Sequence, residues 1–317
     1  MLESLIQGSG KTNTDNNPTI AIAIKETVNL GTLPISAFGS SMAYLDGYLY
    51  ILPGWTVGGS FNYRFFRRHL ETGITTELAS CLVNTTAHTH LAVMDGKIYL
   101  TGGANTGSNT PTPTTSACRY DPFTDKWTSL SPLPRPRLRH TAFERNGELW
   151  LVGGRNGHQY IDKFDPVTNR WESAELLSPL KNVYQGNFVR LGDKLLVMGG
   201  YATSGSSIVE VATVNEVNLD TLEVVDVSTR YGLLSSRSGV VIGFGENIFF
   251  HPSVYGGTYN SKTMAIENGS LKTISSTIPI HHMSAGCKVD KSIYIFGGSA
   301  TGSFSGAHNR LLAVHLE

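Results

Sequence analysis

The sequence predicts an all-β fold in which six similar sheets follow one another along the chain. A strand-like run of apolar residues ends six times at paired glycines or at a substitute, and these points recur about every 50 residues. The six markers are Pro53-Gly54, Gly102-Gly103, Gly153-Gly154, Gly199-Gly200, His251-Pro252 and Gly297-Gly298. A repeat of this length is typical of propeller blades, so we expect a six-bladed β-propeller.

The composition agrees with a strand-rich chain that carries no dominant charge. Hydrophobic residues make up 40% of the sequence and charged residues only 16%. Acidic and basic residues number 25 each, so no net field attracts nucleic acid or an anionic membrane. Cys81, Cys118 and Cys287 are far apart and form no C-x-x-C motif. We therefore expect neither a disulfide framework nor a zinc ribbon, and interpret the three as small buried residues in strands.

The second and third repeats predict all four strands of a blade. In the second, the expected strands are residues 90–94, 97–101, 116–120 and 126–130, with Asp95-Gly96 as the first hairpin turn. The third repeat copies this order from Phe143 to Trp171. Paired glycines would let the second and third strands of each blade approach closely, because no side chain intervenes.

Local motifs in these two repeats resemble the kelch family. Tyr120-Asp121-Pro122 is followed by Trp127 and Leu133-Pro134, and Phe164-Asp165-Pro166 with Trp171 repeats the pattern. Asp-Pro favours a type I turn, and the aromatic residues are expected to pack between adjacent blades. The resemblance covers about residues 20 to 317, with motifs in two blades and spacing alone in the others, and it implies a kelch-type propeller.

The last repeat is incomplete, which predicts how the ring closes. Only one strand, residues 311–315, follows Gly297-Gly298, whereas residues 20–24 form a strand-like run near the N-terminus. We expect this N-terminal strand to complete the last blade within a domain of residues 19–317, because closure removes exposed sheet edges. Residues 1–18 are polar and are expected to form a flexible arm outside the ring.

Motifs for catalysis or metal binding are weak. Gly10-Lys11-Thr12 lacks the upstream glycine and flanking strand of a phosphate loop. His88 and His90 share one face of a strand, but we expect no metal and no other cofactor. The basic run of residues 135–140 is suited to a phosphate or carboxylate and is too short for nucleic acid.

The expected binding surface lies where the first strands of the blades begin and where the long loops gather. Such polar entrances with aromatic and Arg residues are suited to a protein or a glycan ligand. The strand entrances also carry Gln185 and His281, and the Pro-rich stretch of residues 110–115 is expected to project from this face. The chosen residues are Trp55, His88, His90, Arg139, His140, Tyr184, Arg237 and His282.

The favoured function is non-enzymatic binding or a structural role. The composition, with few charges and abundant small polar residues, resembles that of bacteriophage tail and fibre proteins. The leading hypothesis is therefore a structural or receptor-binding virion component that residues 1–18 dock on the particle. The alternatives are a cytosolic kelch adaptor that binds another protein, and a carbohydrate-acting enzyme of the sialate mutarotase or galactose oxidase type. The N-terminus has no secretory signal and no apolar run is long enough to cross a bilayer, so we expect a virion or cytoplasmic location.

Overall fold

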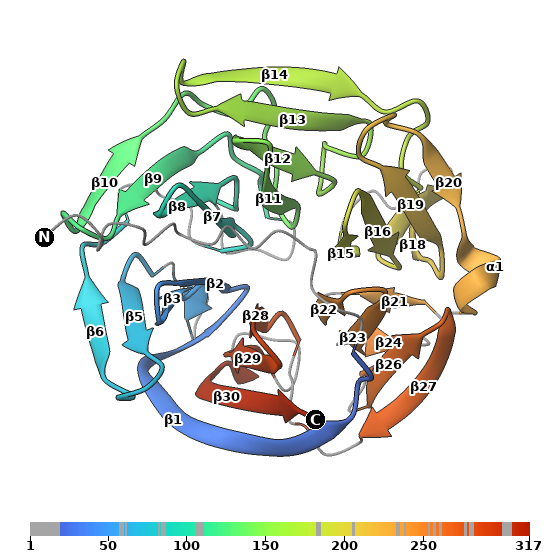
Figure 1. Cartoon of the computed structure of the whole chain (residues 1–317). Coiled ribbons are helices and arrows are strands. Elements are labelled where there is room, and N and C mark those ends of the chain that lie inside the picture. The colour runs from blue at the N-terminus through green and yellow to red at the C-terminus, as the bar shows by residue number, and fades with distance from the viewer. Residues whose placement is uncertain are drawn as a thin grey trace, which may run out of the picture.

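A computed structural model gives the architecture of most of the chain. The residues described are 20–56, 60, 62–81, 83, 87–105, 111–181, 185–204, 207–232, 235–237, 239–252, 254–255, 258–259, 262–275, 278, 282–299 and 306–317. Six sheets stand around a common axis, each with its first strand innermost (Figure 1). The predicted all-β, six-bladed propeller is confirmed.

The first three blades run outward from the axis in chain order (Figure 1). Blade 1 contains β2 (Ser41–Leu45), β3 (Tyr48–Leu52), β5 (Phe65–His69) and β6 (Thr75–Leu78). Blade 2 contains β7 (His90–Met94), β8 (Lys97–Thr101), β9 (Ala117–Asp121) and β10 (Lys126–Ser129). Blade 3 contains β11 (Thr141–Arg145), β12 (Glu148–Val152), β13 (Tyr160–Asp165) and β14 (Arg170–Glu175).

The fourth and fifth blades have the same order with short additions in their loops. Blade 4 contains β15 (Asn187–Leu191), β16 (Lys194–Met198), β19 (Val214–Asn218) and β20 (Val224–Asp226), with the hairpin β17 (Tyr201–Ser204) and β18 (Ser207–Glu210). Blade 5 contains β22 (Val240–Phe244), β23 (Asn247–His251), β26 (Thr263–Glu267) and β27 (Ser270–Ser275). A three-stranded sheet of β21 (Ser236–Arg237), β24 (Val254–Tyr255) and β25 (Thr258–Tyr259) stands beside it, and α1 (Ser228–Tyr231) joins blades 4 and 5.

The sixth blade combines the two ends of the described chain. It contains β28 (Ala285–Val289), β29 (Ser292–Phe296) and β30 (His308–Leu316), and β1 (Ile24–Phe38) is its outermost strand (Figure 1). The end of β1 also pairs with β4 (Trp55–Thr56), a short strand in the loop of blade 1. Closure of the ring by an N-terminal strand is thus confirmed.

The closing strand begins later than the expected run of residues 20–24. Ile22 instead packs between blades 5 and 6, and its backbone N–H donates to Glu267 Oε1 at 2.6 Å. The side-chain Nδ2 of Asn247 donates a hydrogen bond to the carbonyl oxygen of Ile20 at 2.8 Å. The apolar side chain at position 22 is fully buried in the cluster between these two blades.

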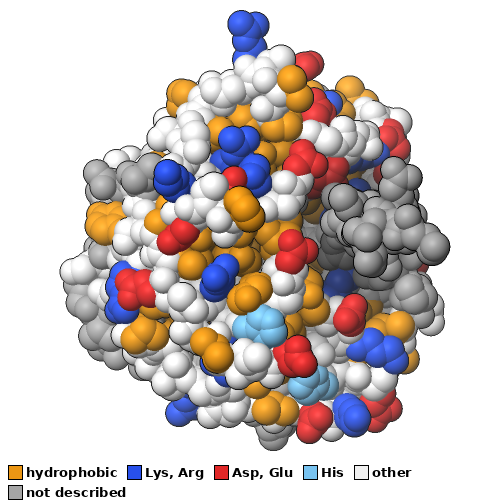
Figure 2. Space-filling view, turned by 60° about the vertical axis from the view of Figure 1, so that its left-hand side comes forward, with side chains coloured by type: hydrophobic (Ala, Val, Ile, Leu, Met, Phe, Trp, Pro, Cys, Tyr) orange, Lys and Arg blue, Asp and Glu red, His pale blue; other side chains and the backbone are white. Residues whose placement is uncertain are grey.

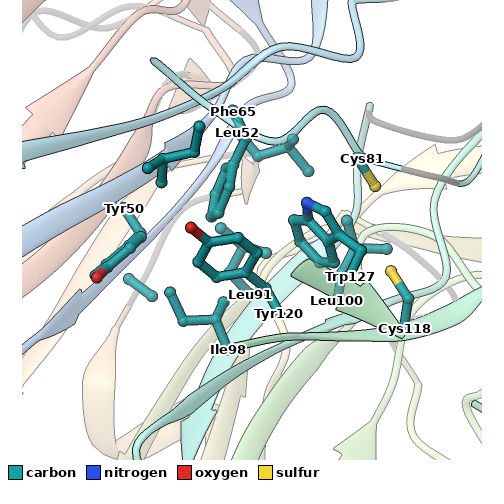
Figure 3. Close-up of a cluster of buried hydrophobic side chains, with 12 residues drawn as sticks. Tyr50, Leu52, Phe65, Cys81, Leu91, Ile98, Leu100, Cys118, Tyr120 and Trp127 are labelled. Atoms are coloured by element: carbon teal, nitrogen blue, oxygen red, sulfur yellow. The ribbon is translucent and has the colours of Figure 1, made fainter. Parts of the chain in front are cut away.

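The hydrophobic core is divided among the junctions between adjacent blades. Figure 3 shows the cluster between blades 1 and 2, where Tyr50, Phe65, Tyr120 and Trp127 meet. The rings of Phe65 and Tyr120 lie edge to face with their centroids 5.0 Å apart. The expected packing of the motif aromatics between blades is therefore observed, and it supplies both buried area and ring contacts.

Candidate functional site

A cavity of about 210 Å³ lies on the axis where the inner strands of all six blades begin. Its lining mixes polar and apolar groups, and Arg139 is its single Lys, Arg, Asp or Glu side chain among the described residues. The lining residues are Gly39, Ser40, His88, Thr89, His90, Arg139, His140, Thr141, Gln185, Gly186, Asn187, Phe188, Gly239, Val240, Val241, Met283, Ser284 and Gly286. This cavity is the candidate site, because it collects side chains from the whole ring.

An unusual backbone conformation recurs at the entrance to the inner strands. Gly39, His88, Arg139, Gln185 and Met283 each lie two residues before an inner strand, and each has a φ between +55° and +65°. A non-glycine residue in this left-handed region costs about 1–3 kcal/mol and is enriched at functional sites. Repetition of the conformation gives each of these five blades an equivalent entrance residue at the cavity.

Backbone hydrogen bonds link these entrance residues to one another. The N–H of Gly39 donates to Met283 O at 3.0 Å, that of His88 to Gly39 O at 2.8 Å, and that of Arg139 to His88 O at 3.0 Å. A continuous belt therefore joins blades 6, 1, 2 and 3 around the axis. Because the belt fixes the backbone, the side chains at the cavity are presented from a rigid frame.

Glycines next to the belt provide the space it needs. Gly102 has a φ of +58°, and a Cβ there would stand 2.5 Å from Arg137 O and 2.7 Å from His140 Cε1. A Cβ at Gly154 would stand 2.6 Å from Leu138 O. The paired glycines therefore make room for the strand entrance of blade 3, rather than for the approach of the second and third strands expected from the sequence.

The guanidinium of Arg139 is held by neutral groups. Arg139 Nη2 lies 3.0 Å from His88 Nε2 and 3.9 Å from Met283 Sδ. With the Gln185 amide turned so that its oxygen faces the guanidinium, that oxygen accepts from Nη2 at 3.1 Å and also from Nη1. No Asp or Glu is among the described residues that line the cavity. The site therefore presents a cation supported by uncharged acceptors.

The three histidines of the cavity are neutral at pH 7. Burial is the largest cause, and it lowers the pKa of His88 and of His140 well below the usual value, with neighbouring charged and imidazole groups adding to it. Burial also lowers the pKa of His90 to about 4, against hydrogen bonds to the His140 and Ala142 backbones. Buried neutral imidazoles act as hydrogen-bonding groups, so they add no charge to that of Arg139.

Only one of the two ring nitrogens of His140 has a hydrogen-bond partner among the described residues. Its Nε2 lies 2.8 Å from Thr101 Oγ1, while its Nδ1 has no hydrogen-bond partner within the described part of the chain. The residue is 4% exposed and lines the cavity beside His90, whose ring centroid lies 6.2 Å away. A buried polar atom without a partner costs free energy unless a ligand or water satisfies it.

The other predicted site residues have different positions. Trp55 packs edge to face on His88 with ring centroids 4.6 Å apart, so it supports the cavity from outside its lining. His282 is buried, and its backbone N–H donates to Ser299 O at 3.0 Å. Arg237 stands in β21, which pairs with β24. Tyr184 and His281 lie outside the described residues.

The basic run of residues 135–140 is divided between two roles. Arg137 is fully buried, and its Nε and Nη2 donate to Asp162 Oδ2 at 3.0 and 2.7 Å. Arg135 pairs with Oδ1 of the same carboxylate. Two of the three arginines are therefore committed to blade 3, and only Arg139 reaches the cavity, so the run is not a common anion site.

The Pro-rich stretch does not project where the structure describes it. Thr114 N–H donates to Gly103 O at 2.9 Å, and Arg137 N–H donates to Thr114 O at 2.9 Å. Pro113 also forms a bridge with Ala104. These backbone hydrogen bonds keep residues 111–115 against the ring, while residues 106–110 lie outside the described part.

A metal site and a membrane-spanning helix each require a characteristic arrangement of residues. Among the described residues, no group of three or more His, Cys, Asp or Glu side chains is placed to hold a metal ion. None of the helices described is long and apolar enough to cross a membrane. Figure 2 shows acidic and basic side chains interspersed over the described part of one face, as expected for a chain with no net charge.

Sequence reasoning missed Gly39 and Met283 as cavity residues. Both occupy the position equivalent to His88 and Arg139, two residues before an inner strand. Their residue types carry no chemical signal. Alignment of the repeats on the inner strands would have found them, because the spacing is the same in each blade.

Comparisons with known proteins agree with the fold. The Kelch motif family matches residues 86–134. Kelch-like protein 26 of Danio rerio is 26% identical over 122 residues, which cover 37% of this chain and 20% of that protein. The influenza virus NS1A-binding protein homolog of Mus musculus is 42% identical over 67 residues, 21% of this chain and 10% of that protein.

The same comparisons set limits on the similarity. The matches span about a fifth of the length of the first curated relatives. The solved structure of YjhT superposes with a TM-score of 0.73 at 17% identity, covering 90% of this chain and 97% of that one, which shows a shared fold. Together with the repeated motifs and the six blades, these matches show that the chain contains a Kelch motif and has the fold of a six-bladed kelch-type β-propeller.

Proposed function

We propose that this protein is a non-enzymatic binding protein, and that its partner is another protein that places a carboxylate against Arg139. The observation that carries the proposal is a single guanidinium inside a cavity that all six blades line. The relatives support binding in general. The mouse relative is named for a protein that it binds, and 21% of this chain matches it.

The chemistry of the cavity favours an anionic group. A guanidinium recognises a carboxylate through paired, charge-assisted hydrogen bonds. His88 and Gln185 orient Arg139 with neutral atoms, and they do not neutralise it. His140 Nδ1 offers a further polar contact in the same cavity.

The dimensions favour a side chain over a larger ligand. Drug-sized ligands occupy pockets of roughly 300–1,000 Å³. The cavity here measures about 210 Å³, which is suited to one acidic side chain of a docked protein. The belt of backbone hydrogen bonds fixes the receiving groups beforehand, so little ordering free energy is lost on binding.

The test is affinity capture of partners from the source with the native protein and two variants. Arg139→Ala removes the guanidinium from the cavity, and Arg170→Ala removes an exposed guanidinium from the outer strand of blade 3 as a matched control. We expect the captured protein to bind the purified native chain and Arg170→Ala equally and to be lost with Arg139→Ala. Equal binding by all three proteins would refute the carboxylate anchor.

A more specific form of this proposal is that the protein is a virion component that residues 1–18 attach to the particle. Residues 1–18 lie outside the described part, and the relatives named above are not named as virion proteins. The hypothesis therefore depends on composition. Deletion of residues 1–18 should abolish attachment to a particle while leaving capture of the cavity partner intact, and unchanged attachment would refute the docking role.

The alternatives make different predictions in the same experiments. A cytosolic adaptor would retain one cellular partner with or without residues 1–18. A carbohydrate-acting enzyme would turn over a member of a sugar panel, and Arg139→Ala would then affect kcat or KM. Turnover by the native protein would replace the non-enzymatic proposal.

A further inference from the structure

Two of the three cysteines meet at the junction between blades 1 and 2. Cys81 follows β6 and is 6% exposed, and Cys118 lies in β9 and is fully buried. Figure 3 shows both sulfur atoms on the same side of the apolar cluster, beyond Trp127. The side chains of Cys81 and Cys118 both belong to this cluster, and each thiol perturbs the pKa of the other.

The segment that carries Cys81 is fixed on both sides. The N–H of Ala79 donates to Asp125 Oδ1 at 2.9 Å, and the indole N–H of Trp127 donates to Ala79 O at 2.9 Å. The N–H of Cys81 itself donates to Tyr63 O at 2.9 Å. Backbone contacts therefore hold Cys81 beside β9, so its approach to Cys118 does not depend on side-chain rotation alone.

Cys118 of blade 2 and Asp162 of blade 3 occupy equivalent positions in their sheets. Cys118 pairs across the sheet with Leu100 and Ser129, and Asp162 pairs with Leu151 and Ser173 in the same way. In blade 3 this position joins the strand to the incoming segment through the buried ion pair of Asp162 with Arg137. Blade 2 has a pair of thiols where blade 3 has a pair of charges.

We propose that Cys81 and Cys118 form a modification site, at which a hydroperoxide oxidises the two thiols to a disulfide that joins blade 1 to blade 2. The Cys81 thiolate attacks the O–O bond, which gives a sulfenic acid and releases hydroxide or alkoxide. The Cys118 sulfur then displaces the sulfenic oxygen as water and forms the S–S bond. In sum, two thiols lose two hydrogen atoms and two electrons, and the hydroperoxide is reduced to water and an alcohol or a second water.

The surroundings distinguish the two sulfur atoms. The neighbouring Cys118 thiol is the main cause that lowers the pKa of Cys81, and the Cys81 thiol together with burial raises the pKa of Cys118 well above its usual value. Cys81 is also the more exposed of the two thiols, at 6% against 0%, so a hydroperoxide reaches it first and Cys81 is the attacking thiol. Cys118 is the resolving thiol.

Cys287 serves as an internal control. It lies in β28 and packs against a different hydrophobic cluster, on the junction between blades 6 and 1. Burial raises its pKa to about 12, so little thiolate is present at neutral pH. It has the same chemistry as the other two cysteines without a second thiol in its cluster.

The test uses the purified full chain treated with hydrogen peroxide and then alkylated under denaturing conditions. Peptide mass spectrometry should find Cys81 and Cys118 linked, with the linked peptide lighter by two hydrogen atoms than its reduced parts, and Cys287 fully alkylated. The linked form should also unfold at a higher temperature than the reduced form. Alkylation of all three cysteines to the same extent would overturn the proposal, and so would a link that involves Cys287.

Two variants separate the roles of the thiols. Cys287→Ser should retain the link at the native rate. Cys118→Ser should abolish the link and leave a sulfenic acid at Cys81 that a dione probe traps. If Cys118→Ser does not fold, Cys81→Ser gives the second measurement, because it should leave Cys118 unreacted, and oxidation of Cys118 in that variant would overturn the assignment of Cys81 as the attacking thiol.

Discussion

Replacing Asp162 by Asn should destabilise the protein strongly. Among the described residues, Asp162 carries the only negative charge paired with the fully buried guanidinium of Arg137. Arg137 is 0% exposed, and the side chain of Asp162 is 0% exposed as well. The carboxylate accepts from Arg137 Nε at 3.0 Å and from Nη2 at 2.7 Å, and it also accepts from Ser173 Oγ at 2.7 Å. An amide at this position keeps the shape and loses the charge.

The expected magnitude follows from the burial of both partners. Removal of one member of a buried ion pair costs about 3–5 kcal/mol, since the other charge remains desolvated. Three backbone carbonyls would still accept from Arg137, at distances between 2.7 and 3.3 Å, which favours the lower half of that range. We therefore expect Asp162→Asn to lower the free energy of unfolding by about 3–4 kcal/mol.

Urea denaturation at pH 7 measures the change, with Glu77→Gln as the control. Glu77 pairs with Arg64 at 2.7 Å, but both side chains are more than a third exposed, and such pairs contribute only about 0–1 kcal/mol. The double variant Arg137→Met with Asp162→Leu should lose less than Asp162→Asn alone, because no unpaired charge remains. A loss for Asp162→Asn no larger than that for Glu77→Gln would refute the reasoning.

Three further predictions concern the histidines, the glycines and the closing strand. The pKa of His90 is lowered to about 4 in the folded protein, so the unfolded chain binds a proton more readily, and the free energy of unfolding should be highest above about pH 6.5 and fall between pH 6.5 and 4. Urea titrations at several pH values should show a smaller fall for His90→Gln. Gly102→Ala should destabilise the protein far more than Gly96→Ala, because both glycines have a positive φ but only the Cβ at 102 would meet a backbone oxygen at 2.5 Å. Equal urea midpoints for the two variants would contradict this. Leu33→Ala, in the closing strand and 2% exposed, should cost about 2–5 kcal/mol, and a loss below 1 kcal/mol would show that β1 contributes little to closure.

The fold could be predicted because its signals are local. Asp121-Pro122 and Trp127 each set a turn or a core contact within a few residues, and the glycine pairs and their substitutes recur about every 50 residues. The number of blades and the closure by an N-terminal strand follow from counting these signals. The start of β1 at Ile24 did not follow, because it depends on how Ile22 packs between two distant blades.

The site could be predicted only in part, because long-range partners decide which side chains reach the cavity. Arg137 and Arg139 are two residues apart in one basic run. Arg137 is taken by Asp162, which is 25 residues away, whereas Arg139 meets His88, which is 51 residues away in the opposite direction. The approach of Cys81 to Cys118 across 37 positions likewise has no signal in the spacing of the cysteines.

The left-handed entrance residues favour a binding role for the cavity over a purely structural one. A structural turn at these positions would favour glycine, which adopts a positive φ without strain. Glycine does occur at Gly39, where a Cβ would stand 2.9 Å from the His88 ring. Four other blades instead have His88, Arg139, Gln185 and Met283 in the same conformation, at a cost that glycine would avoid. The belt already fixes the backbone at His88, Arg139 and Met283, so what the larger residues add is their side chains, which line the cavity around the guanidinium of Arg139.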